Sequence, residues 1–209
     1  MNTTEIAIMS VFAALVVLAL LLGLRQMRQR RAQMQEFAAA RGWSYIRFDN
    51  QLVARLQSMD PATVWTAEDI AQFGDTWLFG ASSQARVATS KPSYGTACLV
   101  ERSAPDITAT VMVTRRVPLI EKLLPWRVAE LGSDEFRRGY VAACSDPEVA
   151  RRAVTSEVQR ALVEHDSGPA WVLTVTLSAS GVVVQSTWAK TPEEWDYLVR
   201  LTTRLSQSK

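Results

Sequence analysis

The chain has 209 residues, 48% of them hydrophobic, and its formal net charge is +2. This length allows one domain of ordinary size with an appendage. The charges are unevenly spread, since residues 42–209 carry 18 basic and 19 acidic side chains. Such a near-neutral body disfavours a general nucleic-acid-binding surface, and we expect no nucleic acid among the partners.

An uncharged apolar segment lies near the N-terminus. Residues 6–24 form a run of nineteen that only Ser10 and Gly23 interrupt. A helix of that length rises about 28 Å, just enough to cross the roughly 30 Å hydrocarbon core of a bilayer. A buried core helix would show a polar face, and a cleavable signal peptide would have a basic start and a small-residue cleavage site. The segment therefore predicts a transmembrane anchor over residues 1–24.

A basic segment follows the apolar run. Residues 25–41 carry five arginines against Glu36 and are rich in strong helix formers, so they predict a helical stalk that ends at Gly42. By the positive-inside rule, the N-terminus is expected outside the cell (inner) membrane and the domain in the cytoplasm. The first expected partner is thus the lipid bilayer. The arginines predicted at the membrane surface are Arg25, Arg28, Arg30 and Arg31.

The first part of the body, residues 42–209, mixes strand and helix patterns. A short helix is expected after Asp49 and ends at Asp60, and another is expected to begin within residues 66–69. The clearest alternation of apolar and polar side chains covers residues 107–115. Strands are predicted at 43–48, 76–80, 84–89, 94–101, 107–115, 126–129 and 138–144.

The C-terminal part has stronger helix signals. Asp146 followed by proline predicts the start of a helix over 147–164, and Thr191 with Glu194 forms a capping box that opens a helix over 191–206. Between them, residues 171–188 read as a β-hairpin. Because the middle strands follow one another with short turns, we expect an α+β domain with two layers. Its mixed or antiparallel sheet would carry these two helices on one face.

Sequence motifs of familiar catalysis are missing. The chain has no phosphate-binding glycine loop and no nucleophile elbow, and its single histidine, His165, stands at the end of a predicted helix. Cys98 and Cys144 are far apart and predict buried, reduced side chains rather than a metal site. We expect no cofactor, no metal and no catalytic residue, although a carboxylate pair assembled across the fold stays open. Such a pair would draw on acids of the kind found at 134–135 and 193–194.

Seven tryptophans are many for this length. Four of them fall on faces predicted to be core: Trp43, Trp171, Trp188 and Trp195. The other three, Trp65, Trp77 and Trp126, lie in less regular stretches and are the candidates for an interaction surface.

The sequence resembles a family of bacterial, mainly actinobacterial, single-pass membrane-anchored proteins. The shared features are Ala40-Arg41-Gly42-Trp43-Ser44-Tyr45, Gly132-Ser133-Asp134-Glu135-Phe136, Asp146-Pro147, and Trp188 followed by the last helix. The resemblance covers most of the chain, is weakest over residues 60–100, and implies a membrane anchor followed by a cytoplasmic α+β domain. It implies no activity and no site residues.

These observations favour a non-enzymatic interaction module or accessory subunit of a membrane assembly. Other membrane proteins are therefore expected partners, while the oligomeric state stays open. A membrane-tethered sensor of a lipid or small ligand is one alternative, and a carboxylate-based membrane-tethered enzyme is another. An apolar cavity or basic rim near the stalk would favour the sensor.

Overall fold

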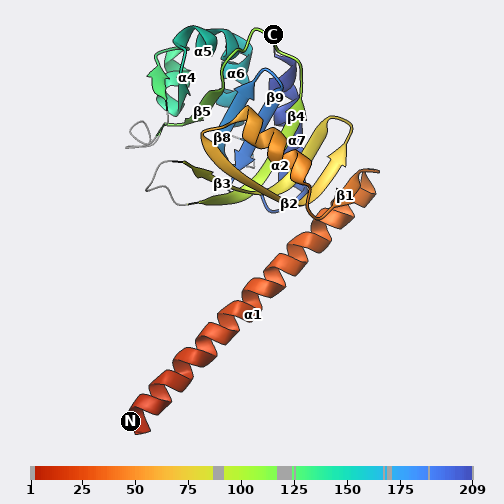
Figure 1. Cartoon of the computed structure of the whole chain (residues 1–209), viewed down its shortest axis with the longest axis vertical. Coiled ribbons are helices and arrows are strands. Elements are labelled where there is room, and N and C mark those ends of the chain that lie inside the picture. Colours follow the sequence, from red (N-terminus) through yellow and green to blue (C-terminus); the bar gives the residue numbers. More distant parts are fainter. Residues whose placement is uncertain are drawn as a thin grey trace.

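The computed structural model describes residues 3–86, 92–116, 124, 126–166, 168, 171–187 and 189–208. Its N-terminal helix α1 (Thr3–Ala40) projects far from the rest of the chain (Figure 1). Among the described residues, Val11–Ala40 is the one helical segment long and apolar enough to cross a membrane. Its most apolar window has a mean hydropathy of 1.8, and none of that window is buried. A helix capable of crossing a membrane, with a helical continuation after it, is therefore present near the N-terminus.

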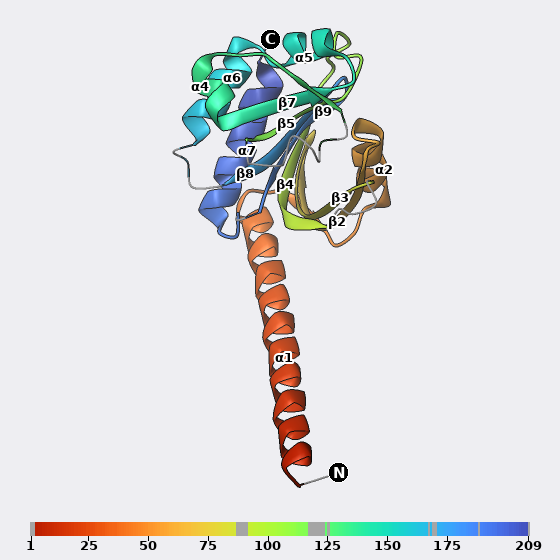
Figure 2. The ribbon, with the colours of Figure 1, turned by 90° about the vertical axis from the view of Figure 1, so that its left-hand side faces the viewer.

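The described strands form one nine-stranded antiparallel sheet in the order β1-β2-β3-β4-β9-β8-β5-β7-β6. Figure 2 shows α1 meeting the sheet near β2, β3 and β4. The α+β class with an antiparallel sheet is thus confirmed. The strands are β1 (Ser44–Ile46), β2 (Thr63–Phe73), β3 (Thr76–Ala85), β4 (Ser93–Glu101), β5 (Val111–Arg115), β6 (Arg127–Ala129), β7 (Tyr140–Cys144), β8 (Val172–Ser178) and β9 (Gly181–Ser186).

Strands β2 and β3 differ most from the sequence prediction. The prediction of a helix that begins within residues 66–69 was wrong, because this segment lies in β2, which pairs with β3. The strand expected at 76–80 and the start of the one expected at 84–89 are one strand, β3, which continues through residues 82–83 because β2 and β4 pair with it on both sides. Residues 87–89 of the second predicted strand lie outside the described residues. A β-bulge between Glu68 and Ala71 gives Asp69 a positive φ of 50°.

The helices end and begin largely where their capping residues predict. Asp49 caps α2, and Thr191 with Glu194 makes the expected capping box of α7. The single helix predicted over 147–164 is two helices, because Thr155 accepts a hydrogen bond from the Val158 amide and starts a new one. The helices of the body are α2 (Asn50–Met59), α4 (Asp134–Gly139), α5 (Pro147–Ala153), α6 (Ser156–His165) and α7 (Pro192–Gln207).

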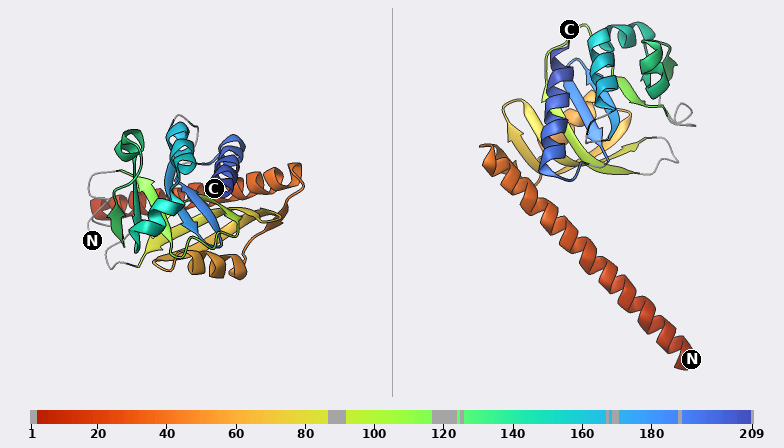
Figure 3. Two further views of the ribbon diagram at one scale, coloured as in Figure 1. Left: turned by 90° about the horizontal axis from the view of Figure 1, so that it is seen from above. Right: turned by 180° about the vertical axis from the view of Figure 1, so that it is seen from behind.

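Two apolar cores lie on opposite faces of the sheet. The larger core contains residues of α1, α5, α6 and α7, and both cysteines are buried in it as free thiols. The smaller core lies under α2 and contains alternate residues of the same strands. Figure 3 (left) shows α2 below the sheet and α6 and α7 above it. The sequence predicts helices on one face of the sheet, so α2 on the other face adds a layer at this end.

The last turns of α1 belong to the larger core. Met34, Phe37 and Ala38 are buried there, at most 3% exposed, while the helix from Val11 to Met27 is exposed. The Phe37 ring packs edge-on against Trp195 of α7 at 5.5 Å between ring centroids. The helix ends at Gly42, whose φ of +67° is the left-handed conformation that glycine adopts most easily. The anchor helix and the domain are therefore joined by packing as well as by chain connection.

The buried carboxyl of Asp60, beside the smaller core, predicts how the stability of the chain depends on pH. Its residue is 1% exposed, neither carboxylate oxygen has a hydrogen-bond partner of good geometry, and burial raises the pKa of the carboxyl. The folded state therefore binds the proton more tightly than the unfolded chain, and stability falls as pH rises above the ordinary aspartate pKa of about 3.9. We expect Asp60→Asn to raise Tm at pH 7 by about 3 °C or more.

The gain from Asp60→Asn should vanish near about pH 2.5, well below the ordinary aspartate pKa, where the wild-type carboxyl is protonated in both states. The matched control is Asp75→Asn, because Asp75 is exposed, and it should leave Tm unchanged at both pH values. A wild-type chain that gains stability between pH 4 and 7 through Asp60 would contradict the expectation. Thermal scans of the full chain in detergent micelles measure Tm for the wild type and for both variants.

Candidate functional site

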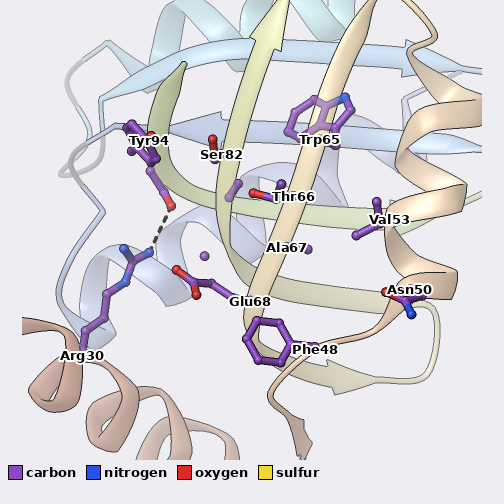
Figure 4. A pocket seen from close by; sticks show the side chains of 13 residues that line it. Arg30, Phe48, Asn50, Val53, Trp65, Thr66, Ala67, Glu68, Ser82 and Tyr94 are labelled. Atoms are coloured by element: carbon purple, nitrogen blue, oxygen red, sulfur yellow. Dashed lines mark hydrogen bonds between the residues drawn. The ribbon is translucent and has the colours of Figure 1, made fainter. Parts of the chain in front are cut away.

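A cavity of about 470 Å³ opens where α1 meets the sheet. Figure 4 shows Arg30 reaching into it from α1, with Glu68 and Thr66 on β2, Tyr94 on β4, and Val53 on α2. Aromatic side chains and a charged pair thus share one concave surface. The complete lining is Arg30, Phe48, Asn50, Val53, Trp65, Thr66, Ala67, Glu68, Gly80, Ala81, Ser82, Tyr94 and Gly95.

Arg30 is fixed by the sheet. Its Nη2 donates to the carbonyl oxygen of Gly95 at 3.0 Å and to Oγ1 of Thr96 at 2.9 Å. Burial lowers the pKa of the guanidinium, and the nearby Glu68 and Asp69 carboxylates oppose that shift, so the group stays charged. The residue beneath it is Gly80, where a Cβ atom would lie 3.5 Å from Nη2. A positive charge is therefore held at a set position in the cavity wall.

Arg31 makes a second link between α1 and the sheet. Its Nε donates to Oδ1 of Asp69 at 3.0 Å, and the Tyr45 hydroxyl donates to the same oxygen at 2.6 Å. Asp69 reaches this position because it is the extra residue of the β2 bulge. The other two arginines predicted at the membrane surface, Arg25 and Arg28, are exposed on α1 nearer the apolar stretch. Their contact with lipid stays a prediction.

The Tyr45–Asp69 contact predicts an unusual phenol titration. Burial first, and then the hydrogen bond to the Asp69 carboxylate, raise the pKa of Tyr45 to about 12. We expect Asp69→Asn to lower this pKa, because the neutral amide no longer disfavours a phenolate beside it. Ultraviolet absorbance titration of the full chain, with Tyr45→Phe subtracted to isolate this residue, measures the change. An unaltered Tyr45 titration in Asp69→Asn would contradict the assignment.

The three tryptophans singled out in the sequence do not form one exposed surface. Trp65 and Trp77 are each 4% exposed in the smaller core, where alternate residues of β2 and β3 face α2. Trp65 also borders the cavity, and the Arg55 guanidinium lies over Trp77 at 5.2 Å. Trp126 is half-buried just before β6. Trp188 lies outside the described residues. The exposed aromatic groups at the cavity are instead Phe48 and Tyr94, 57% and 68% exposed.

The histidine and the paired acids that the sequence offered lie in structural positions. His165 is buried, and its Nδ1 lies 3.0 Å from the hydroxyl of Tyr197 on α7. Within the described part of the chain, no three His, Cys, Asp or Glu residues gather in a metal-binding arrangement. The acids of 134–135 and 193–194 occupy the first turns of α4 and α7, where negative charge stabilises a helix. The cavity beside Arg30 is therefore the site that the geometry singles out.

One solved structure has a fold similar to that of this chain. No family model and no curated protein sequence matches the chain. The fold is similar to the crystal structure of the mycobacterial trehalose monomycolate transport factor A, TtfA, with a TM-score of 0.55 and 14% sequence identity. The superposition covers 86% of this chain and 93% of that one. The likeness shows a shared fold, and it comes from an actinobacterial protein, in keeping with the resemblance noted in the sequence.

Proposed function

We propose that the chain is a single-pass membrane protein, with its N-terminus outside and its domain in the cytoplasm, that serves as a non-enzymatic accessory subunit of a transport assembly. The observation that carries this proposal is the continuity of α1, which leaves the apolar stretch and enters the core at Met34 and Phe37. A domain joined in this way is presented to neighbouring membrane proteins at a set distance from the bilayer.

The distance from the apolar run to the cavity beside Arg30 is short. From Leu24, the last residue of the apolar run, to Arg30 is six residues, or about 9 Å along a helix. The polar layer on each side of the hydrocarbon core is roughly 5–8 Å thick. The cavity beside Arg30 thus lies near the level of the lipid head groups. TtfA, which has a similar fold, is named as a trehalose monomycolate transport factor, and this name supports a role in transport at the membrane.

The test is purification from the native membrane. The full chain, tagged after Lys209 and expressed at its natural level, is crosslinked and extracted in several mild detergents. We expect the same integral membrane protein to co-purify in each. The matched control replaces residues 1–24 with an unrelated apolar span and keeps the stalk, and it should still capture that protein. A chain that emerges alone from every detergent would overturn the accessory role.

Membrane orientation needs a separate test. A reporter fused after Lys209 should be active only in the cytoplasm, because the basic stalk follows the apolar run. Activity only outside the cell would overturn the proposed topology, whatever the purification shows.

A ligand sensor is the second candidate, and the cavity with its basic wall favours it. Arg30 has further guanidinium N–H groups besides the two bonds from Nη2. Binding of a photoreactive anionic lipid to the full chain in nanodiscs should fall in Arg30→Gln and persist in Arg28→Gln, which changes an exposed arginine on the same helix. Equal labelling of both variants would argue against a sensor at this cavity.

A further inference from the structure

Strand β2 has a free edge beside the cavity. Strand β1 pairs with β2 only at residues 70–72, and the final rung is the bond from the Asp69 amide to the Arg47 carbonyl. The chain then turns away into α2. At the other end, the Thr63 amide donates to the Asp60 carbonyl, and the Gln57 side chain donates to the Thr63 carbonyl. Between these two points β2 pairs with β3 on one side, and none of the described strands lies on the other.

The direction of each backbone group follows from the alternation of an antiparallel ladder. The Arg86 amide donates to the Ala62 carbonyl, so the backbone groups of Ala62 point toward β3. Because the register from Thr63 to Glu68 is regular, the backbone groups of every second residue after Ala62 also point toward β3. The amide and carbonyl groups of Trp65 and Ala67 therefore point away from β3. Within the described residues, these amide and carbonyl groups have no backbone hydrogen-bond partner.

The cavity runs along this edge. Trp65, Thr66, Ala67 and Glu68 form its inner wall, and residues from the start of α2, including Val53, face them. Free edges are usually protected by lysine, proline or a covering element. The segment Thr63–Glu68 contains neither residue, and its bulge lies beyond Glu68. The edge therefore lacks a partner among the described strands, and the cavity gives access to it, although Trp65 and Ala67 are only 4% and 6% exposed.

We propose that an extended peptide segment of a membrane-protein partner adds to β2 as a strand, hydrogen-bonded to Trp65 and Ala67. The added strand continues the ladder that β1 begins. Side chains opposite Trp65 and Ala67 would face the apolar groove under α2, and those between them would face Thr66, Glu68 and Arg30. The segment recognised thus alternates small apolar and polar residues. That its source is a membrane protein rests on the proposed function.

Hydrogen exchange on the full chain in nanodiscs tests the free edge directly. Without a ligand, the Trp65 and Ala67 amides should exchange at least about tenfold faster than those of Thr66 and Glu68, which bond to β3. The probe is a blocked peptide of about six residues that alternates valine and threonine. At about 1 mM it should slow the Trp65 and Ala67 amides about tenfold. Unchanged rates at both amides would overturn the proposal.

A backbone variant separates strand addition from other modes of binding. Ala67→Pro removes an outward N–H without touching the ladder to β3, a position that edge strands tolerate. The matched control, Ala67→Ser, keeps the N–H. Affinity for the valine–threonine peptide should fall at least about tenfold in Ala67→Pro and stay within about twofold in Ala67→Ser. Equal affinity of the two variants would overturn the proposal, and the exchange experiment decides it if the proline variant fails to fold.

Three further outcomes are distinguishable. If the Trp65 and Ala67 amides slow as the concentration of the chain itself rises, without peptide, the edge pairs with a second copy and the proposal is overturned. If the peptide binds at the edge but no partner co-purifies from membranes, strand addition stands and the accessory role fails. If a partner co-purifies equally with wild type and Ala67→Pro, the accessory role stands and its use of this edge is overturned.

Discussion

Replacing Phe37 with alanine should lower the free energy of unfolding by about 3–5 kcal/mol, the usual cost of removing a buried aromatic ring. The ring is 3% exposed and packs edge-on against Trp43 at 5.8 Å and Trp195 at 5.5 Å between ring centroids. The Arg41 guanidinium, paired with Asp196, lies over it at 3.9 Å. Phe37 thus joins the anchor helix to the first strand region and to α7.

The matched control for Phe37→Ala is Gln35→Ala, two residues earlier on the exposed side of the same helix. It should change the free energy by less than about 0.5 kcal/mol. Urea unfolding of the full chain in detergent micelles, followed by tryptophan fluorescence, measures both. A cost below about 1 kcal/mol for Phe37→Ala would show that the end of α1 is not part of the core.

Gly95→Ala should be the second large effect, with a loss of about 3 kcal/mol, at the upper end of the range for overpacking. A Cβ atom on Gly95 would lie 2.1 Å from the carbonyl oxygen of Ser186 and 2.9 Å from its carbonyl carbon. Both are backbone atoms held by the pairing of β4 with β9, so the strands must separate to admit a methyl group. The Gly95 carbonyl also accepts the Arg30 bond, so the cavity wall should loosen as well.

Gly23→Ala is the comparison for Gly95→Ala, because a Cβ atom on Gly23 would have no neighbour within 4 Å. It should leave the unfolding of the domain unchanged within about 0.5 kcal/mol. The same urea titrations report both variants. A Gly95→Ala chain as stable as the Gly23→Ala chain would contradict the close approach of β4 and β9.

The candidate site combines residues that local sequence patterns treat as equivalent. Arg28 and Arg30 have the same side chain and the same helical surroundings, yet Arg28 is exposed and Arg30 bonds to Gly95 and Thr96. The partners are 65 and 66 residues away in the chain. Charge composition therefore predicts a basic stalk, but which arginine enters the cavity depends on which face of α1 the sheet meets.

The same reason explains the errors in the sheet. Residues 66–69 contain acids and alanine that favour a helix start, but pairing with β3 holds residues 66–68 extended, and Asp69 forms the bulge beside α1. The break between α5 and α6 had a visible signal in Thr155, a good N-cap residue inside an apolar pattern of helical period. Periodicity alone continues through such a break, because both helices bury their apolar stripe in the same core.

The sequence alone determined the properties that depend on neighbouring residues. The apolar run, the basic stalk, the caps at Asp49, Asp146 and Thr191, and the α+β class all follow from composition, period and local hydrogen bonding. Only the tertiary structure decided that α2 covers the opposite face, that Arg30 and Arg31 bind the sheet, and that β2 keeps an open edge. These depend on contacts between residues far apart in the chain, which packing of the whole domain selects.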